Sequence, residues 1–289
     1  MLPKYKSTRN KKQVREVDTL LIKKEYKRKG TRLSYLGMPS GEMKDIIQWG
    51  NYLGRISAVE IDPSQRLKLA LNVMRKGMEG NVTILFGDIQ DILIKGKDYF
   101  GNKLEFPYDI VFLDFFGTIL YKKLKRVDAI KKLIERQKGN DFLFLLTFNL
   151  KEKKYSTHTL KLVLDKIKTE LVRFCSHDDL LREKIVGIIQ TYKSREIEEM
   201  YRQKLFVPYF IKTRSEQFGF KVHCYPPVFY RGFRNNPMIH FSCKLKSQLA
   251  SPTHVISEQT LIDILNLNLK EVAKGRIYVR KEQMPCIRI

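Results

Sequence analysis

Short apolar runs alternate with stretches of helical periodicity through the first half of the chain. Runs of this length that are apolar throughout are typical of strands covered on both faces of a parallel sheet. Because strand and helix alternate five times with short connections, the pattern predicts a doubly wound α/β domain with right-handed crossovers. The five predicted strands are 33–36, the run that ends at 60, 82–86, 108–114 and 141–148.

The alternation is interrupted at 151–203 by two amphipathic segments, which predict a helical insertion. It resumes with a helix over 205–218 and strands over 219–225 and 238–245. No helix separates these last two strands, so we expect them to pair antiparallel. A helix over 257–273 and a short extended tail should follow. The expected fold class is a mostly parallel, seven-stranded α/β sheet with an antiparallel last strand and a helical insertion.

Three parts of the chain differ in composition: a basic leader over 1–31, the α/β domain over 32–250, and a C-terminal helix and tail over 251–289. The first dozen residues of the leader are predicted to be disordered. A short helix is predicted over 14–28, with four residues on one face: Val17, Leu20, Leu21 and Lys24. In the same way, Leu67, Leu71 and Met74 predict the buried face of the helix that begins at Pro63.

The charge of the chain favours a polyanionic partner. The formal net charge is +24, from 55 Lys and Arg against 31 Asp and Glu, which exceeds what solubility requires. Nucleic acid is therefore the preferred partner, ahead of a membrane, because no apolar run of spanning length and no amphipathic anchor with an aromatic face is present. Without a secretory signal pattern, the expected compartment is the cytoplasm.

The four cysteines form no C-x-x-C pair, and the five histidines lack ligand spacing. Buried free thiols are therefore expected, and no metal site is indicated.

A glycine-containing turn follows the first predicted strand and precedes a helix. It runs through Gly37, Met38, Pro39 and Gly41, and the next strand ends in Glu60, nineteen residues after the last glycine. Glycine lets a ligand approach the backbone closely, and a following helix directs its unpaired N–H groups at that ligand. A carboxylate at this distance can accept hydrogen bonds from both ribose hydroxyls. The arrangement predicts a nucleoside-binding site.

Over about 32–246, apart from the insertion, the chain resembles the class I S-adenosylmethionine-dependent methyltransferases. The resemblance rests on four landmarks that occur in the family's order. They are Gly37-x-Pro39-x-Gly41, the stretch Ala58-Val59-Glu60-Ile61-Asp62-Pro63, Gly87-Asp88-Ile89, and Asp114-Phe115-Phe116-Gly117. Two positions depart from the family pattern, because Pro39 replaces the middle glycine of the turn and Tyr35 stands where many members carry an acid.

The resemblance implies S-adenosylmethionine as the cofactor and a role for each landmark. The turn, Met38 included, would lie against the methionine part of the cofactor. Glu60 would bind the ribose and Ile61 would lie against the adenine. Asp88 would accept from the adenine amino group, while a backbone N–H beside it, in the Asp88-Ile89 pair, would meet a ring nitrogen. Asp114 would stand beside the transferable methyl group.

The fourth landmark also carries the candidate catalytic residues Asp114, Phe115 and Phe116. A carboxylate can accept a hydrogen from a target amine and orient its nitrogen, and a phenylalanine can stack on a base taken out of its helix. Two alternatives remain open: the carboxylate caps the following helix, and the phenylalanines pack in the core. The landmark resembles the Asp-Pro-Phe-Gly of enzymes that dimethylate a tRNA guanine, with Phe115 in place of proline.

Two basic segments are candidates for contact with nucleic acid. The end of the leader can either contact phosphates or remain a solvated tail. A proline-containing loop mixes aromatic and arginine residues, which suits stacking together with phosphate contact, although an ordinary hairpin explains it as well. The candidate residues are Arg28, Lys29 and Arg32 in the leader and Tyr230, Arg231 and Arg234 in the loop.

Three hypotheses about function follow. The first is a methyltransferase that acts on nucleic acid, RNA ahead of DNA, at a base nitrogen. The second is a catalytically silent subunit with the same fold that binds nucleic acid within a larger complex. The third, a methyltransferase acting on a small molecule or protein, is disfavoured by the charge. Oligomeric state is left open.

Overall fold

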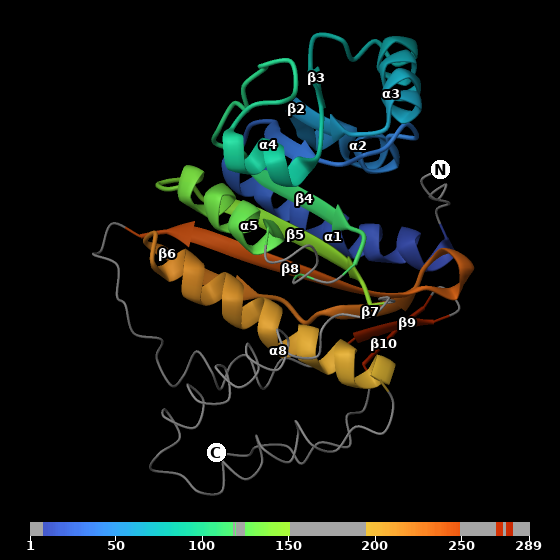
Figure 1. Cartoon of the computed structure of the whole chain (residues 1–289), viewed down its shortest axis with the longest axis vertical. Helices are drawn as coiled ribbons and strands as arrows, with labels where there is room; N and C mark the ends of the chain where they lie inside the picture. Colours follow the sequence, from blue (N-terminus) through green and yellow to red (C-terminus); the bar gives the residue numbers. More distant parts are fainter. Residues whose placement is uncertain are drawn as a thin grey trace, which may run out of the picture.

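The computed structural model describes residues 8–117, 119, 125–150, 195–248, 270–273 and 276–279. Its strands form one sheet, and helices cover both faces of that sheet (Figure 1). The five predicted strands of the first half all form and pair in parallel, in the order β3-β2-β1-β4-β5. They are β1 (Leu33–Gly37), β2 (Leu53–Glu60), β3 (Val82–Phe86), β4 (Ile110–Phe115) and β5 (Phe142–Asn149).

The sheet continues beyond β5 through one long antiparallel strand, β8 (Pro237–Ser247), which pairs with β5 along eight residues. The other edge of β8 pairs with two short strands in succession, β6 (Phe220–Cys224) and β7 (Val228–Arg231). Two prolines, 226 and 227, separate these strands, because proline has no N–H to donate to a ladder. The predicted antiparallel last strand is thereby confirmed, and the predicted loop after residue 225 contains the strand β7.

Two further short strands extend the same sheet. β9 (Lys270–Ala273) pairs in parallel with β7, and β10 (Arg276–Val279) pairs antiparallel with β9. β9 occupies residues that the sequence assigned to the end of a helix over 257–273, so this boundary was wrong.

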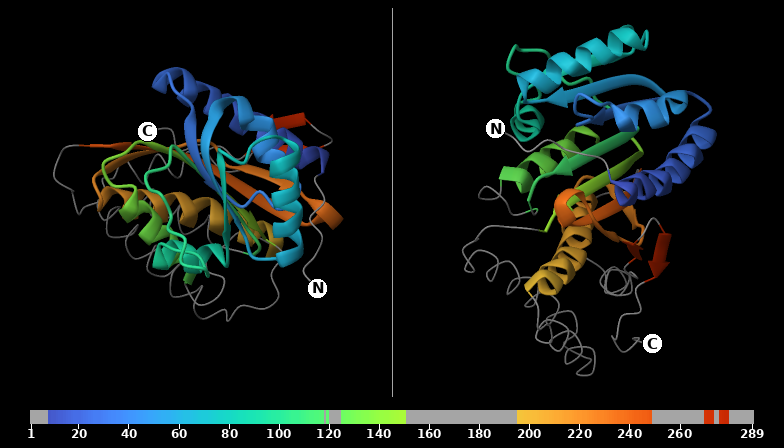
Figure 2. Two further views of the ribbon diagram at one scale, coloured as in Figure 1. Left: turned by 90° about the horizontal axis from the view of Figure 1, so that it is seen from above. Right: turned by 90° about the vertical axis from the view of Figure 1, so that its right-hand side faces the viewer.

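The two faces of the sheet have separate cores. The helices α4 (Ile89–Lys95), α5 (Lys125–Arg136) and α8 (Arg195–Glu216) cover one face, over a core rich in Phe, Leu and Ile. The helices α2 (Lys44–Trp49) and α3 (Pro63–Arg75) contribute to the second core, together with part of the first helix. Figure 2 shows helices on both sides of the twisted sheet from two directions. This layered arrangement confirms the predicted α/β fold class, but the described sheet has ten strands where seven were predicted, because short strands extend it beyond β8.

The leader is part of this domain. Residues 9–29 form a 21-residue helix, α1 (Arg9–Lys29), which lies against the sheet, so the predicted disorder of the first dozen residues is wrong from residue 9 onward. The predicted face is also wrong, because Leu20 is 67% exposed whereas Val14 and Ile22 are buried. The buried stripe contains charged residues that a search for apolar positions passes over, namely Arg15, Asp18 and Glu25.

The face of α3 was mispredicted in the same way. Leu67, Leu71 and Met74 are exposed, while Leu69 and Val73 are buried in the second core. The helix also contacts the glycine turn through Asn72, whose side chain donates to the carbonyl oxygen of Gly41 at 2.7 Å.

Most of the predicted insertion lies outside the described residues. Its described end, from 195 onward, is continuous with the helix expected at 205–218, and together they form α8, with Pro208 inside it. Within the described residues, no helix has the length and apolar content needed to cross a bilayer.

Candidate functional site

The carboxyl ends of the parallel strands bring most of the predicted site residues to one edge of the sheet. The strand order reverses direction at β1, which pairs with β2 on one side and with β4 on the other. In open α/β sheets, ligands bind outside the carboxyl ends of the strands at such a switch point. Gly37 ends β1, Glu60 ends β2 and Asp114 lies one residue before the end of β4. The structure therefore places these three residues on neighbouring strands.

The glycines of the turn are required by packing within the chain. A Cβ at Gly37 would overlap the ring of Tyr35, and one at Gly41 would lie 2.8 Å from Gln65 Oε1 and 2.9 Å from Lys68 Cβ of α3. The turn reaches its helix by an unusual path, with positive φ at two non-glycine residues, Ser40 (53°) and Met43 (51°). The helix α2 begins at Lys44 and has only six residues, so the predicted N–H array directly after Gly41 is not formed.

Tyr35, one of the two departures from the resembled pattern, is paired with an acid on α2. Its hydroxyl donates to the carboxylate of Asp45 on α2, and both side chains are buried. Burial raises the pKa of Asp45, and burial together with the Asp45 charge raises the pKa of the Tyr35 hydroxyl well above its ordinary value. Sequence reasoning missed this buried pair, because Asp45 lies outside the glycine turn.

Glu60 is half-buried at the end of β2. Its Oε1 accepts the backbone N–H of Asp62 at 2.9 Å, which fixes the carboxylate beside the start of α3. Burial raises the pKa of Glu60 above its ordinary value, although backbone N–H groups oppose the shift. Ile61 follows it and is exposed, as a residue lying against a ligand would be.

Asp88 caps α4, because its Oδ1 accepts the backbone N–H of Gln90 at 2.8 Å. The backbone N–H of Asp88 donates to the hydroxyl of Tyr99 at 3.4 Å. The ring of Tyr99 lies over Gly87, where it packs edge-on against Phe86. Ile89 is the first residue of α4, and its side chain is buried in the core, so only its backbone faces the predicted adenine site.

Asp114 is paired with a residue that sequence reasoning missed. The ammonium group of Lys11, in the first turn of α1, contacts Asp114 Oδ2, and the two side chains are 17% and 12% exposed. The other carboxylate oxygen, Oδ1, is buried and has no hydrogen-bond partner. The structure therefore places a carboxylate with one unsatisfied oxygen at the switch point of the sheet.

The two phenylalanines after Asp114 have different environments. Phe115 is buried, stacks on Phe148 with ring centroids 5.8 Å apart, and packs in the core. Phe116 is 50% exposed. Arg126 of α5 fixes this segment, since it lies 4.3 Å over the Phe115 ring and donates to the carbonyl oxygens of Phe116 and Gly117. Of the two rings, only Phe116 is accessible for stacking.

The candidate nucleic-acid residues lie at opposite ends of the strands of the sheet. The leader residues lie where β1 and β4 begin: Lys29 binds Asp109 at 2.6 Å, and Arg28 binds Asp141 at 3.3 Å. The loop residues lie at the other end, where Arg231 ends β7 and accepts from Asn10 of α1 through its carbonyl oxygen. The structure does not bring the two groups together. Their side chains also differ, since Arg32 and Arg234 are exposed, Arg231 is half-buried and Tyr230 is buried.

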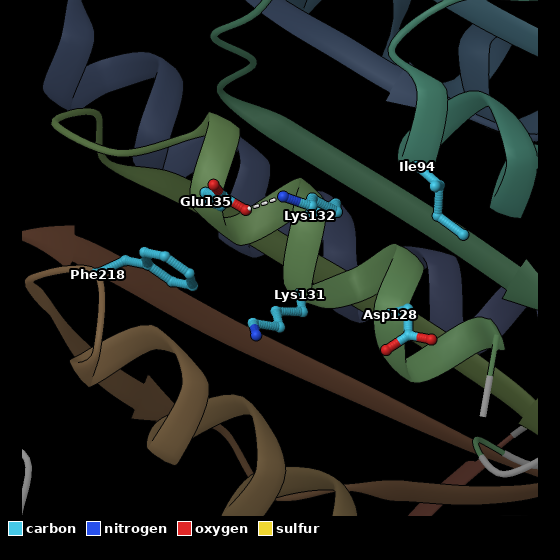
Figure 3. Close-up of a pocket in the computed structure, with 6 residues that line it drawn as sticks. All are labelled: Ile94, Asp128, Lys131, Lys132, Glu135 and Phe218. Carbon is cyan, nitrogen blue, oxygen red and sulfur yellow. Dashed lines mark hydrogen bonds and ion pairs between the residues drawn. The ribbon is translucent and has the colours of Figure 1, made fainter.

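An open pocket of about 400 Å³ lies away from this edge (Figure 3). Residues of α5, the end of α4 and Phe218 line it, and Lys132 and Glu135 form an ion pair there at 2.8 Å. No residue predicted for the site lines this pocket.

Glu60 fits the ribose end of S-adenosylmethionine, because backbone N–H groups fix its half-buried carboxylate at the end of β2. Asp114 fits the position that the resemblance gives it beside the transferable methyl group, because its Oδ1 has no hydrogen-bond partner within the described residues. The turn between them fits through its backbone alone, since its glycines are packed against Tyr35 and α3. The two carboxylates, Glu60 and Asp114, therefore fit the cofactor.

Comparisons with known proteins gave no matching family model and no matching curated protein. Solved structures similar to this chain include an O-methyltransferase from Bacillus cereus in complex with S-adenosylhomocysteine, at 12% identity and a TM-score of 0.46, covering 85% of this chain and 84% of that one. Another is the O-methyltransferase of tomaymycin synthesis from Streptomyces achromogenes in complex with S-adenosylmethionine, at 14% identity and a TM-score of 0.44, covering 80% and 79%. An rRNA methylase from Streptococcus thermophilus is similar at 10% identity and a TM-score of 0.36, covering 75% and 88%. The strand order of this chain, β3-β2-β1-β4-β5 followed by the antiparallel β8, stands on its own pairing, with the landmark residues at the switch point.

Proposed function

We propose that the protein is an S-adenosylmethionine-dependent methyltransferase that acts on nucleic acid, RNA ahead of DNA, at a base nitrogen. One observation carries the proposal. Two carboxylates, those of Glu60 and Asp114, stand at the carboxyl ends of the strands on either side of β1, at the switch point of the sheet.

Each residue then has a defined task. The bound cofactor supplies an electrophilic methyl group on a sulfonium sulfur. Glu60 accepts the ribose hydroxyls through the carboxylate that Asp62 N–H orients. Asp114 orients the group that receives the methyl, and Phe116 offers an exposed ring for stacking on a base. Positioning of this kind provides most of the acceleration in a displacement with a good leaving group.

The charge distribution supports nucleic acid as the substrate. The protein has a net charge of +24, and the outward face of α1 exposes lysines that no described ion pair neutralises: Lys23, Lys24 and Lys27. A basic helix face of this kind binds phosphates without regard to sequence. Arg32 and Arg234 add exposed positive charge at the two ends of the strands.

Calorimetric titration with S-adenosylmethionine tests the cofactor assignment. The wild-type protein should bind in the micromolar range, and Glu60→Gln should weaken binding at least tenfold at neutral pH, because a neutral amide is a poorer acceptor than a carboxylate. Burial raises the pKa of Glu60, so wild-type affinity should fall on acidification at a higher pH than an ordinary glutamate would give. Glu60→Gln should remove that dependence. Equal affinity of variant and wild type would refute the ribose assignment.

Salt-dependent binding tests the substrate class. Affinity for single-stranded RNA should fall steeply with salt, and replacement of the three α1 lysines by Gln should reduce the slope of log affinity against log salt by about 2. Methyl acceptance from RNA and DNA oligonucleotides of the same sequence then distinguishes the two. Salt-independent binding would exclude a phosphate-contacting surface on α1.

A catalytically silent subunit is the second candidate. It is favoured by the pairing of Asp114 with Lys11 and by the packing of Tyr35 against Gly37, both of which occupy the site with groups of the chain itself. A protein that melts cooperatively and binds neither S-adenosylmethionine nor S-adenosylhomocysteine would establish this alternative.

A further inference from the structure

The contact between Lys11 and Asp114 sets the charge of the candidate site. The lysine comes from α1 and the carboxylate from β4, 103 residues apart in the chain. Both side chains are largely shielded from solvent, so their attraction is stronger than that of a surface ion pair. The carboxylate that the site presents at the switch point is therefore neutralised by a cation belonging to the chain.

Contacts on both sides of Lys11 hold it in place. Its backbone N–H donates to the Thr8 side chain at 3.2 Å, and the Asn10 side chain donates to Arg231 O at 3.1 Å. Val14 packs in a buried cluster with residues of β7 and β8. The first turns of α1 are thus fixed against the sheet, and the ammonium group stays at Asp114.

The same helix contributes a second positively charged side chain. Arg15 is buried, one turn beyond Lys11, and its charge lowers the pKa of Asp45, opposing the effect of burial. α1 therefore supplies positive charge to both carboxylates near the turn.

We propose that Lys11 is a specificity-determining residue that weakens binding of the methyl donor relative to the demethylated product, an inference that rests on the proposed function. S-adenosylmethionine carries a sulfonium cation, whereas the sulfur of S-adenosylhomocysteine is neutral. An unpaired Asp114 would attract the sulfonium, but a pair with Lys11 has no net charge, and the ammonium group repels a second cation. Lys11 thereby shifts the preference of the site toward the neutral thioether.

The test compares the affinities of both compounds in four proteins by calorimetry: wild type, Lys11→Met, Lys11→Arg and Lys12→Met. The neighbouring Lys12 is exposed and provides the matched control, because it removes the same charge from the same helix away from the site. The ratio of the dissociation constant of S-adenosylmethionine to that of S-adenosylhomocysteine should fall about fivefold or more in Lys11→Met. It should stay at the wild-type value in Lys11→Arg and Lys12→Met.

Each outcome has a definite meaning. Binding of both compounds with an unchanged ratio in Lys11→Met overturns the role of Lys11 and leaves the proposed function standing. An equal fall in Lys12→Met also overturns it, because the effect would then be one of overall charge. Absence of binding in all four proteins, with cooperative melting retained, overturns the proposed function itself and the inference with it.

Discussion

The helices α1 and α5 lie against the same sheet but are attached to it by different forces. α5 buries an apolar stripe, with Ala129, Ile130, Leu133 and Ile134 fully inaccessible. α1 is attached mainly through polar groups, and its partners alternate along β8 so that they face one side of the sheet. The contacts are Asp18 Oδ1 with His240 Nε2 at 2.9 Å and Glu25 with Lys244 at 2.7 Å, both buried.

The difference between the two helices lies in what sets their position. Apolar contacts are non-directional, so α5 is held by burial of area. The buried polar groups of α1 must meet particular partners, because each group left unpaired costs more than a hydrogen bond contributes. His240 is an example of such specific pairing, because one ring nitrogen contacts Asp18 and the other contacts Thr147 at 2.8 Å. Such pairing fixes the register of α1, and with it the position of Lys11.

The largest loss of stability is expected from a change in the apolar stripe of α5. Leu133→Ala should lower the free energy of unfolding by about 3 kcal/mol, because it opens a cavity in a fully buried core. Urea denaturation at low and high salt measures this, and the loss should be the same at both. A loss under 1 kcal/mol would mean that α5 is not anchored by its apolar stripe.

On the polar side, Asp18→Ala should cost about 2 kcal/mol, because His240 and Ser242 lose their shared acceptor in a buried position. Asp18→Asn should cost less, since an amide oxygen can still accept. Glu16→Ala on the exposed side of α1 is the matched control and should change stability little. If Asp18→Ala were as mild as Glu16→Ala, the buried network would not anchor the helix.

The contrast also explains which parts of the structure were predictable from the sequence. The parallel strands are mostly apolar, so their runs identify β1 to β5, and the landmarks at their ends identify Gly37, Glu60 and Asp114. The face of α1 could not be found by an apolar search, because most of its buried stripe is charged. A different signal was present, since the stripe recurs at alternating spacings of four and three: Lys11, Arg15, Asp18, Ile22 and Glu25.

The partners of that stripe are distant in the chain, which is why the site remained incomplete. Lys11 and Asp114 are 103 residues apart, and Asp18 and His240 are 222 apart. No local pattern links residues so far apart. The short strand β9 was missed for a related reason, because its parallel partner β7 lies far from it in the chain.

The smallest expected change in stability tests which face of α1 is buried. Leu20→Ala should change the free energy of unfolding by no more than about 0.5 kcal/mol, because the side chain is 67% exposed. Ile22→Ala, two residues along, should cost about 2 kcal/mol or more, because Ile22 is fully buried in the second core. Denaturation of both variants under one condition measures the difference. A larger loss of stability in Leu20→Ala than in Ile22→Ala would mean that the face predicted from apolar spacing is the buried one. Asp18 and Glu25 would then face solvent. Lys11 lies on the same stripe and could no longer reach Asp114.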